Sequence, residues 1–243
     1  MVSFLKRIIN YKRSRFWGTM SPENFVTYLE KNGVKVGQRV NFRYPKSVTI
    51  DLTRPLLIRL GNDLDINANF SIMTHDFCSF VFRNCYDDFL PSSGEVTIGN
   101  NIYFGRDVTI LKGVTIGDNC IIGAGSIITK SIPSNSVAAG VPCKVLCTLD
   151  EYYSRRKKEA LIEAIQYAKV LRRKYGSICP GDLTEEWAIF LTEEDYLQYP
   201  EFKRNAEKRL GNKTSKWLSE SRQINGYSQF LEQVKDEDDE KER

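Results

Sequence analysis

His75 is the only histidine in this 243-residue sequence, and it is the side chain best suited to acid–base chemistry near neutral pH. An imidazole can take a proton from a hydroxyl group and return it within one reaction cycle. A lone histidine is more often a structural residue, so the count alone does not assign a function. It does exclude a zinc site made of three histidines from one chain, and we expect no metal site.

A histidine that acts as a general base needs a carboxylate to orient its ring. Asp76 follows His75 directly in the sequence, but neighbouring side chains on extended backbone point to opposite sides. Asp87 and Asp88 lie a short way further along, and another subunit could also supply the group. We name His75 and Asp76 as candidate catalytic residues and leave the orienting carboxylate open.

The element that must position these residues is a six-residue repeat between Ile98 and Pro133. An aliphatic or aromatic residue opens each of six blocks, and four blocks have Gly in second place. The opening residues are Ile98, Phe104, Ile110, Ile116, Ile122 and Ile128. Neither a helix nor a simple strand has a period of six, whereas a parallel β-helix does. The sequence therefore predicts stacked coils of three blocks, in which the first and fifth residues of each block fill the interior.

The same six-residue phase occurs earlier, with a break at Arg54. Its members are Val36, Phe42, Val48, Leu60, Ile66 and Ile72. The phase is lost between Ile72 and Ile98, so we predict that residues 76–95 form a loop outside the coil. His75 comes just before this loop, in the fourth place of its block, where a side chain should point outward. A loop of this length on a rigid scaffold is often functional, although a structural role fits equally well.

Helical patterns flank the repeat on both sides. Ser21 and Pro22 are typical of a helix start, and Gly33 is typical of a helix end. Apolar residues at helical spacing return between Asp150 and Tyr175. We therefore predict a mainly β protein in three parts: a helical segment 1–33, a β-helix 34–148 and a helical region 149–243 that ends in an acidic tail.

Composition excludes several classes of function. The net charge of +4 is too small to suggest a nucleic-acid partner. No apolar run approaches the roughly 20 residues needed to cross a bilayer, and the amino terminus lacks the apolar core of a secretory signal. Residues 1–20 mix apolar and basic side chains, which suits either peripheral contact with an anionic membrane surface or packing on the neighbouring domain. We expect a cytoplasmic protein, with contact at the inner face of the membrane left open.

The six cysteines are spread along a chain too long to need disulfide bonds for its stability. Cys120 falls on a fifth place of the repeat, where it should act as a small apolar core residue. Cys143 and Cys147 have the spacing of half a metal clip, but no second pair and no histidine lies near them. We expect reduced thiols.

The segment 116–145 resembles the hexapeptide-repeat acyltransferases. It contains Ile-Gly-Ala-Gly-Ser-Ile-Ile-Thr-Lys-Ser-Ile-Pro at 122–133 and Ala-Gly-Val-Pro at 139–142. It is most similar to the sugar O-acetyltransferases of surface-polysaccharide clusters and to the galactoside or maltose acetyltransferases. His75 lies upstream of the repeat, as the catalytic histidine does in that family. The resemblance covers about residues 20–155, and the helical region beyond it has no counterpart.

This resemblance implies a left-handed parallel β-helix, a homotrimer, and acetyl-CoA bound as acyl donor in a cleft between neighbouring subunits. It assigns donor binding to Tyr103, Gly105, Arg106, Gly123, Ala124, Ser126, Thr129, Lys130 and Lys144. The pantetheine arm would contact backbone near Gly123, the two lysines would meet the anionic nucleotide end, and Gly105 or Arg106 would offer an N–H to the oxyanion. Tyr103 stands where many relatives carry Trp, so that contact should differ in detail.

The resemblance further implies that His75 acts as general base while an acceptor hydroxyl attacks the thioester. The acceptor would be a sugar in capsule, O-antigen or exopolysaccharide synthesis, free or lipid-linked. One alternative keeps the fold and changes the acceptor to an amino sugar or to a small molecule such as serine or an antibiotic. Another alternative is a β-helix scaffold subunit without catalysis.

Overall fold

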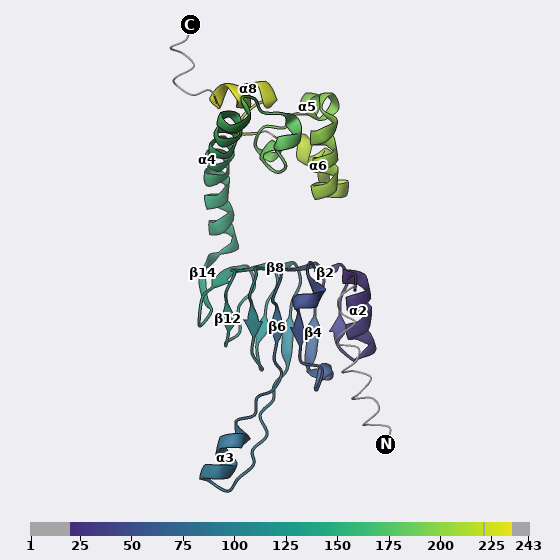
Figure 1. The fold of residues 1–243 in the computed structure, drawn as a ribbon, viewed down its shortest axis with the longest axis vertical. Coiled ribbons are helices and arrows are strands. Elements are labelled where there is room, and N and C mark those ends of the chain that lie inside the picture. The colour runs from purple at the N-terminus through teal and green to yellow at the C-terminus, as the bar shows by residue number, and fades with distance from the viewer. Residues whose placement is uncertain (1–19, 221, 235–243) are drawn as a thin grey trace. The chain divides into compact units, whose positions relative to one another are not determined.

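The computed structural model describes residues 20–220 and 222–234 (Figure 1). The basic segment before residue 20 and the acidic tail after residue 235 lie outside the described residues. The chain divides into two compact units, of which the first ends at Tyr152 and the second begins at Tyr153. The boundary predicted at 148 falls four residues before this division.

The first unit is a parallel β-helix whose short strands form three sheets. Sheet A contains β1 (Lys35–Val36), β4 (Ile58–Leu60), β7 (Val96–Ile98) and β10 (Thr115–Ile116). Sheet B contains β2 (Val40–Phe42), β5 (Leu64–Ile66), β8 (Ile102–Phe104), β11 (Cys120–Ile122), β13 (Ser136–Ala139) and the antiparallel β14 (Lys144–Thr148). Sheet C contains β3 (Thr49–Ile50), β6 (Ser71–Ile72), β9 (Thr109–Ile110) and β12 (Ile127–Ile128). Because successive strands from β1 to β12 join sheets A, B and C in turn, the chain winds in stacked coils, as Figure 1 shows.

The interior of the coils is filled by the residues that the repeat assigns to it. The opening residues of the six blocks are at most 2% exposed. The fifth-place residues are at most 4% exposed; they are Ile102, Val108, Val114, Cys120, Ser126 and Ile132. Burial raises the pKa of the Cys120 thiol and keeps it protonated, so this residue acts as a small apolar group. All six cysteines of the chain are free.

The lengths of the coils explain where the repeat holds and where it breaks. Ile98 pairs with Ile116 at a separation of 18 residues, which is three hexapeptides. Leu60 pairs with Ile98 at a separation of 38 residues. The 20 additional residues match the length of the loop predicted for 76–95.

The first coil is longer than the repeat predicts. Val36 pairs with Leu60 at a separation of 24 residues, because two short helices, η2 (Pro45–Ser47) and η3 (Pro55–Leu57), are inserted. As a result Ile50 pairs with Ile72, whereas the six-residue phase predicts Val48 at that level. Val48 is buried as well, but it lies one position before β3.

The long loop leaves the coil after β6 and carries a short helix, α3 (Ser79–Cys85), which Figure 1 shows projecting away from the sheets. An antiparallel bridge between His75 and Ser93 joins its two ends. The Gly94 N–H also donates to the Thr74 carbonyl at 2.9 Å. The two ends of the loop are therefore held together by backbone hydrogen bonds, with His75 at the first end.

The helix α2 (Pro22–Lys31) closes the first end of the β-helix. Its N-cap Ser21 accepts a hydrogen bond from the Asn24 N–H at 3.3 Å, as the sequence pattern predicts. Phe25 is fully buried and meets Phe42 edge to face, with 4.8 Å between ring centroids. The helix therefore covers the apolar end of the stack, which would otherwise meet water.

The second unit is helical, as predicted. It begins within α4 (Leu149–Tyr175), which ends at Gly176 with a φ of +77°. The remaining elements are η4 (Pro180–Asp182), η5 (Glu186–Ile189), α5 (Glu193–Gln198), α6 (Pro200–Leu210), η6 (Gly211–Lys213), α7 (Thr214–Leu218) and α8 (Tyr227–Gln233). Buried aromatic rings form its core, in which Phe190 stacks on Phe230 at 4.6 Å. Over the described residues, no helix has both the length and the apolar character required to span a membrane.

The close stacking of coils makes a first prediction at Gly105. A Cβ atom at this position would lie 2.5 Å from the Ala124 backbone nitrogen in the next coil. Because backbone cannot yield as a flexible side chain does, Gly105→Ala should cost about 1–3 kcal/mol and lower Tm by roughly 2–12 °C in a thermal melt. Gly181→Ala is the control, since its added Cβ meets its nearest atom at 3.9 Å. Equal Tm values for the two variants would contradict the stacking argument.

Candidate active site

His75 meets a carboxylate that belongs to the preceding coil. Its Nδ1 lies 2.5 Å from Oδ2 of Asp51, the residue that follows β3. Strands β3 and β6 are neighbours in sheet C, which brings together two residues 24 positions apart in the sequence. The imidazole side chain is 34% exposed, whereas the Asp51 side chain is only 10% exposed. The carboxylate of the pair is therefore buried, and the imidazole is accessible.

Asp51 is held in place by hydrogen bonds to both of its oxygens. Oδ1 accepts from the Thr53 N–H at 3.1 Å and from the Thr53 hydroxyl at 2.6 Å. Oδ2 accepts from the Thr74 N–H at 3.1 Å and from the Thr74 hydroxyl at 2.5 Å. Burial on its own would raise the pKa of the Asp51 carboxyl, but the hydrogen bonds from Thr53, Thr74 and His75 together hold that pKa well below its usual range. The carboxylate is thus ionised at neutral pH.

This arrangement decides which ring nitrogen of His75 carries the proton. An ionised carboxylate can only accept hydrogen bonds, so Nδ1 must be the donor. The lone pair of the neutral ring is then on Nε2, and the described residues offer that nitrogen no hydrogen-bond partner. Nε2 can therefore take a proton from a hydroxyl, and Asp51 stabilises the imidazolium that results.

Asp76 does not contact His75. Its Oδ2 pairs with the Lys112 ammonium and accepts from the Ser92 hydroxyl at 3.0 Å, while Oδ1 accepts from the Cys78 N–H at 3.1 Å. The Lys112 charge holds the pKa of the Asp76 carboxyl well below its usual range. Asp76 therefore does not orient the imidazole; it fastens the base of the loop, and its side chain lies on the other side of the extended backbone, as neighbouring side chains do. A direct role in the reaction stays a prediction.

The loop carboxylates also lie away from the histidine. Asp88 accepts a hydrogen bond from the N–H of the next residue at 2.7 Å, and Asp87 lies in a turn with a φ of +50°. The sequence reasoning missed Asp51, although a signal existed. Aligning Ile50 with Ile72, instead of Val48 with Ile72, would have placed Asp51 level with Met73, two residues before the histidine.

Two pairs of predicted donor-binding residues lie at the corner between sheets B and C. Gly105 and Arg106 follow β8, and Gly123 and Ala124 follow β11 one coil further on. The Gly105 N–H already donates to the Ile122 carbonyl at 2.8 Å, so it is not available to an oxyanion. Within the described residues the Arg106 N–H has no such partner. Of the two predicted oxyanion donors, the structure therefore leaves Arg106.

Close stacking accounts for both glycines at this corner. A Cβ on Gly123 would lie 2.7 Å from the Ala139 Cβ, much as a Cβ on Gly105 would collide with Ala124. Ala124 and Arg106 themselves are exposed. Contact with a bound donor at this corner therefore depends on the exposed residues rather than on the glycines.

The side chain of Ser126 belongs to the interior of the coil, and the predicted contact of a donor with backbone near this residue stays a prediction. Its side chain is fully buried, where the hydroxyl donates to the Gly123 carbonyl at 2.6 Å and accepts from the Gly140 N–H at 3.2 Å. Its carbonyl also accepts from the Thr109 N–H at 2.9 Å. The fifth place of a block faces the interior, so the Ser126 hydroxyl is engaged within the coil.

The remaining predicted donor-binding residues are accessible. Tyr103 is 38% exposed on the outer face of sheet B, where the Arg43 guanidinium lies 5.9 Å from its ring centroid. Lys144 is exposed on β14 of the same sheet. Thr129 and Lys130 are exposed after β12, at the corner between sheets C and A that also carries His75 two coils earlier. The predicted residues thus occupy two different corners and one face of a single protomer.

The comparisons with known proteins agree with this architecture. Residues 95–130 match the bacterial transferase hexapeptide family (six repeats). The chain is 61% identical over 56 residues to galactoside O-acetyltransferase of Escherichia coli (strain K12), a match that covers 23% of this chain and 28% of that protein. It is 29% identical over 164 residues to YvoF of Bacillus subtilis (strain 168), a protein assigned as an acetyltransferase without proof; this match covers 65% of the chain and 87% of YvoF.

Residues 95–130 are therefore similar to the hexapeptide-repeat transferases, in agreement with the stacked coils of the fold. A solved galactoside acetyltransferase in complex with coenzyme A is 29% identical, with a TM-score of 0.42, and the match covers 59% of this chain and 80% of that one. This chain spans little more than a quarter of the length of the Escherichia coli protein, so the activity of that protein is not simply transferred to it.

Proposed function

We propose that this protein is an acetyl-CoA-dependent O-acetyltransferase that acts on a sugar hydroxyl in surface-polysaccharide synthesis. The observation that carries the proposal is the pairing of a half-exposed His75 with a buried, ionised Asp51 at 2.5 Å. This is the arrangement that a general base for a hydroxyl requires. The high identity of the repeat region to a galactoside O-acetyltransferase supports the same chemistry.

His75 and Asp51 would act together in the transfer. Acetyl-CoA, as co-substrate, supplies the thioester carbonyl. Nε2 of His75 accepts the proton of the acceptor hydroxyl as its oxygen bonds to that carbonyl carbon, and the Arg106 N–H of a neighbouring protomer would stabilise the oxyanion. When the carbon–sulfur bond breaks, the imidazolium returns the proton to the leaving thiolate. The products are an acetyl ester and free CoA, and the histidine is regenerated.

The proposal includes a homotrimer of left-handed coils. On one protomer His75 lies at the corner between sheets C and A, while Arg106 and Ala124 lie at the corner between sheets B and C. A donor that meets all of them must therefore lie between two protomers. The exposed loop aromatics Phe77 and Phe89 support such contacts, because large apolar side chains gain stability when a partner covers them.

Two further parts of the proposal concern the residues that meet the nucleotide of the donor and the compartment of the reaction. The lysines at 130 and 144 are exposed cations suited to the anionic nucleotide of the donor. We place the reaction in the cytoplasm, where acetyl-CoA is available, and include a lipid-linked glycan among the acceptors so that action at the membrane face is tested too.

The deciding experiment incubates the full chain with acetyl-CoA and a panel of surface glycans. Free thiol release measures turnover, and mass spectrometry identifies the product. We expect an acetylated sugar whose acetyl group is lost in mild alkali, which marks an ester. An alkali-stable product would indicate an amine acceptor instead. No thiol release with any acceptor, together with no heat when acetyl-CoA is titrated calorimetrically, would contradict the proposal and favour a scaffold without catalysis.

A further inference from the structure

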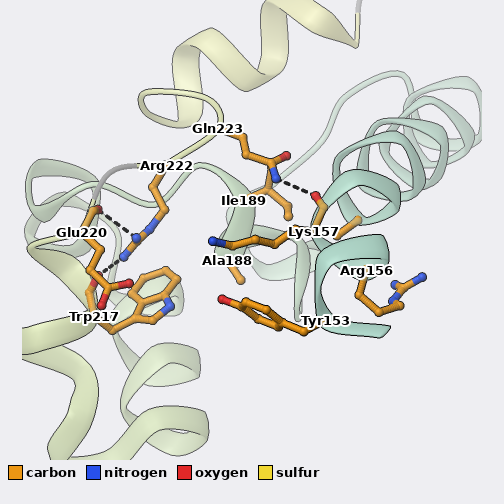
Figure 2. Close-up of a pocket in the computed structure, with 10 residues that line it drawn as sticks. Tyr153, Arg156, Lys157, Ala188, Ile189, Trp217, Glu220, Arg222 and Gln223 are labelled. Atoms are coloured by element: carbon orange, nitrogen blue, oxygen red, sulfur yellow. Dashed lines mark hydrogen bonds between the residues drawn. The ribbon is translucent and has the colours of Figure 1, made fainter. Parts of the chain in front are cut away.

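The second unit contains a cavity of about 300 Å³ that has no part in the site described above (Figure 2). It lies between α4, η5 and the segment after α7, which come from separate parts of the sequence. Its volume lies at the lower end of the range of small-molecule sites. The lining combines aromatic, cationic and amide side chains, which is the chemistry of a polar ligand with a flat apolar face.

Two aromatic rings contribute to the cavity. Trp217 packs edge to face on the buried Trp187, with 5.4 Å between centroids, and the Arg222 guanidinium lies 3.4 Å above its ring. Tyr153 comes from α4, and Figure 2 shows it pointing toward Trp217. Aromatic faces carry partial negative charge and bind the polarised C–H groups on the face of a sugar ring. Arg222 covers one face of Trp217, so the surfaces that the cavity offers a pyranose are the Tyr153 ring and the uncovered part of Trp217.

The charges around the cavity leave one cation in excess. Figure 2 shows the Lys157 ammonium pointing into the cavity, where it lies 5.2 Å from the Tyr153 ring centroid. Arg222 is held by the backbone carbonyls of Trp217 and Glu220, and the Glu220 carboxylate also lines the site and offsets its charge. Arg156 points away in Figure 2 and pairs with Glu163 at 2.6 Å. Lys157 is thus the charge available to a ligand.

An amide completes the lining. The Gln223 Nε2 donates to the Lys157 backbone carbonyl at 2.6 Å, which fixes the side chain across the gap between α4 and the last segment. Its carbonyl oxygen then remains as an acceptor for a hydroxyl. An acceptor, a cation and two ring faces in one cavity match a ligand that has hydroxyls, one negative charge and an apolar face.

We propose that this cavity binds a pyranose that carries a carboxylate, such as a uronic acid residue of an acidic glycan. The sugar ring stacks on Trp217 and Tyr153, its carboxylate pairs with Lys157, and a hydroxyl donates to Gln223. The inference rests on the proposed function and gives its acceptor a class, namely an acidic polysaccharide. Because such a polymer repeats the same residue, one residue can bind here while another is acetylated.

The test measures binding to the full chain without any acyl donor. An oligosaccharide of glucuronic acid and a neutral glucose oligosaccharide of equal length are titrated, with tryptophan fluorescence and calorimetry as readouts. We expect the acidic ligand to bind at least about tenfold more tightly, and salt to weaken this preference because it screens the ion pair. Lys157→Ala should abolish the preference, and Tyr153→Ala should weaken binding of both ligands by roughly tenfold.

The same helix provides matched controls. Lys174 and Tyr175 form an equivalent pair on α4, with 4.9 Å between the ammonium and the ring centroid, but they do not line the cavity. Lys174→Ala and Tyr175→Ala should bind like the natural protein. Equal affinity for acidic and neutral ligands, or equal loss in Lys157→Ala and Lys174→Ala, would overturn the inference. So would tighter binding of a hexose phosphate than of the uronic acid, which would indicate a phosphate site.

The outcome is separable from that of the proposed function. A chain that binds the acidic glycan through Lys157 but releases no thiol from acetyl-CoA would keep this site and contradict the enzymatic proposal. A chain that acetylates small neutral acceptors but shows no preference for the acidic glycan would contradict only this inference.

Discussion

Replacing His75 by Asn is expected to lower kcat for acetyl transfer by about 10²–10⁴-fold, which is the usual contribution of a positioned general base. The Asn amide can still donate to Asp51, so the buried half of the pair keeps a partner. It has no basic nitrogen, however, and cannot take the proton of an acceptor hydroxyl. Steady-state kinetics with the acetylated glycan identified by the panel measures the loss.

Two measurements separate this effect from misfolding. Tm should stay close to that of the natural protein, because the His75 side chain is 34% exposed and is replaced by a group that keeps the hydrogen bond. The calorimetric Kd for acetyl-CoA should also be unchanged. If His75→Asn turned over at the natural rate, the residue would not be the base and the proposed mechanism would be wrong.

Replacing Asp51 by Asn is expected to reduce kcat by roughly 10²–10⁴-fold as well, although Asp51 is a positioning residue that acts through His75. An amide that donates to Nδ1 places the ring proton on Nε2, where it blocks the acceptor hydroxyl. KM for acetyl-CoA should change little, because the lost interaction acts on the base. Restoring the carboxylate with Asp51→Glu should recover part of the rate.

Asp76→Asn is the matched control for this prediction. It removes a carboxylate only 25 positions further along, whose partners are Lys112 and Ser92 rather than the imidazole. We expect a smaller fall in kcat from Asp76→Asn than from Asp51→Asn. The reverse order would mean that the loop carboxylate, and not Asp51, serves the histidine.

The same substitution has a signature in the pH dependence of stability. The pKa of the Asp51 carboxyl is lowered in the folded state, so its stabilising contribution is fully present above the unfolded value of about 3.9 and is lost as pH falls below it. The natural protein should therefore be more stable than Asp51→Asn at neutral pH. Thermal melts between about pH 3 and pH 7 should show this difference shrinking below about pH 4.

The repeat itself could be predicted from the sequence because it is a local property. Each hexapeptide places its own first and fifth residues inward, and the burial of Phe104 and Cys120 follows from their places in their blocks. The loop after His75 was predictable for the same reason. The six-residue register fails between Ile72 and Ile98, so the additional residues must lie outside the coil. The helical periodicity up to Tyr175 is likewise a local pattern that survives in the folded chain.

The pairing of Asp51 with His75 was decided by the tertiary structure. Which residues meet across two coils depends on the length of the coil between them, and the first coil is lengthened by η2 and η3 in a way that the six-residue phase does not report. The cavity beside Lys157 has the same origin, because its walls come from segments more than 60 residues apart. A sequence pattern indicates the period within one strand or helix. Which residues of different elements come into contact is decided only when the apolar core packs in one register.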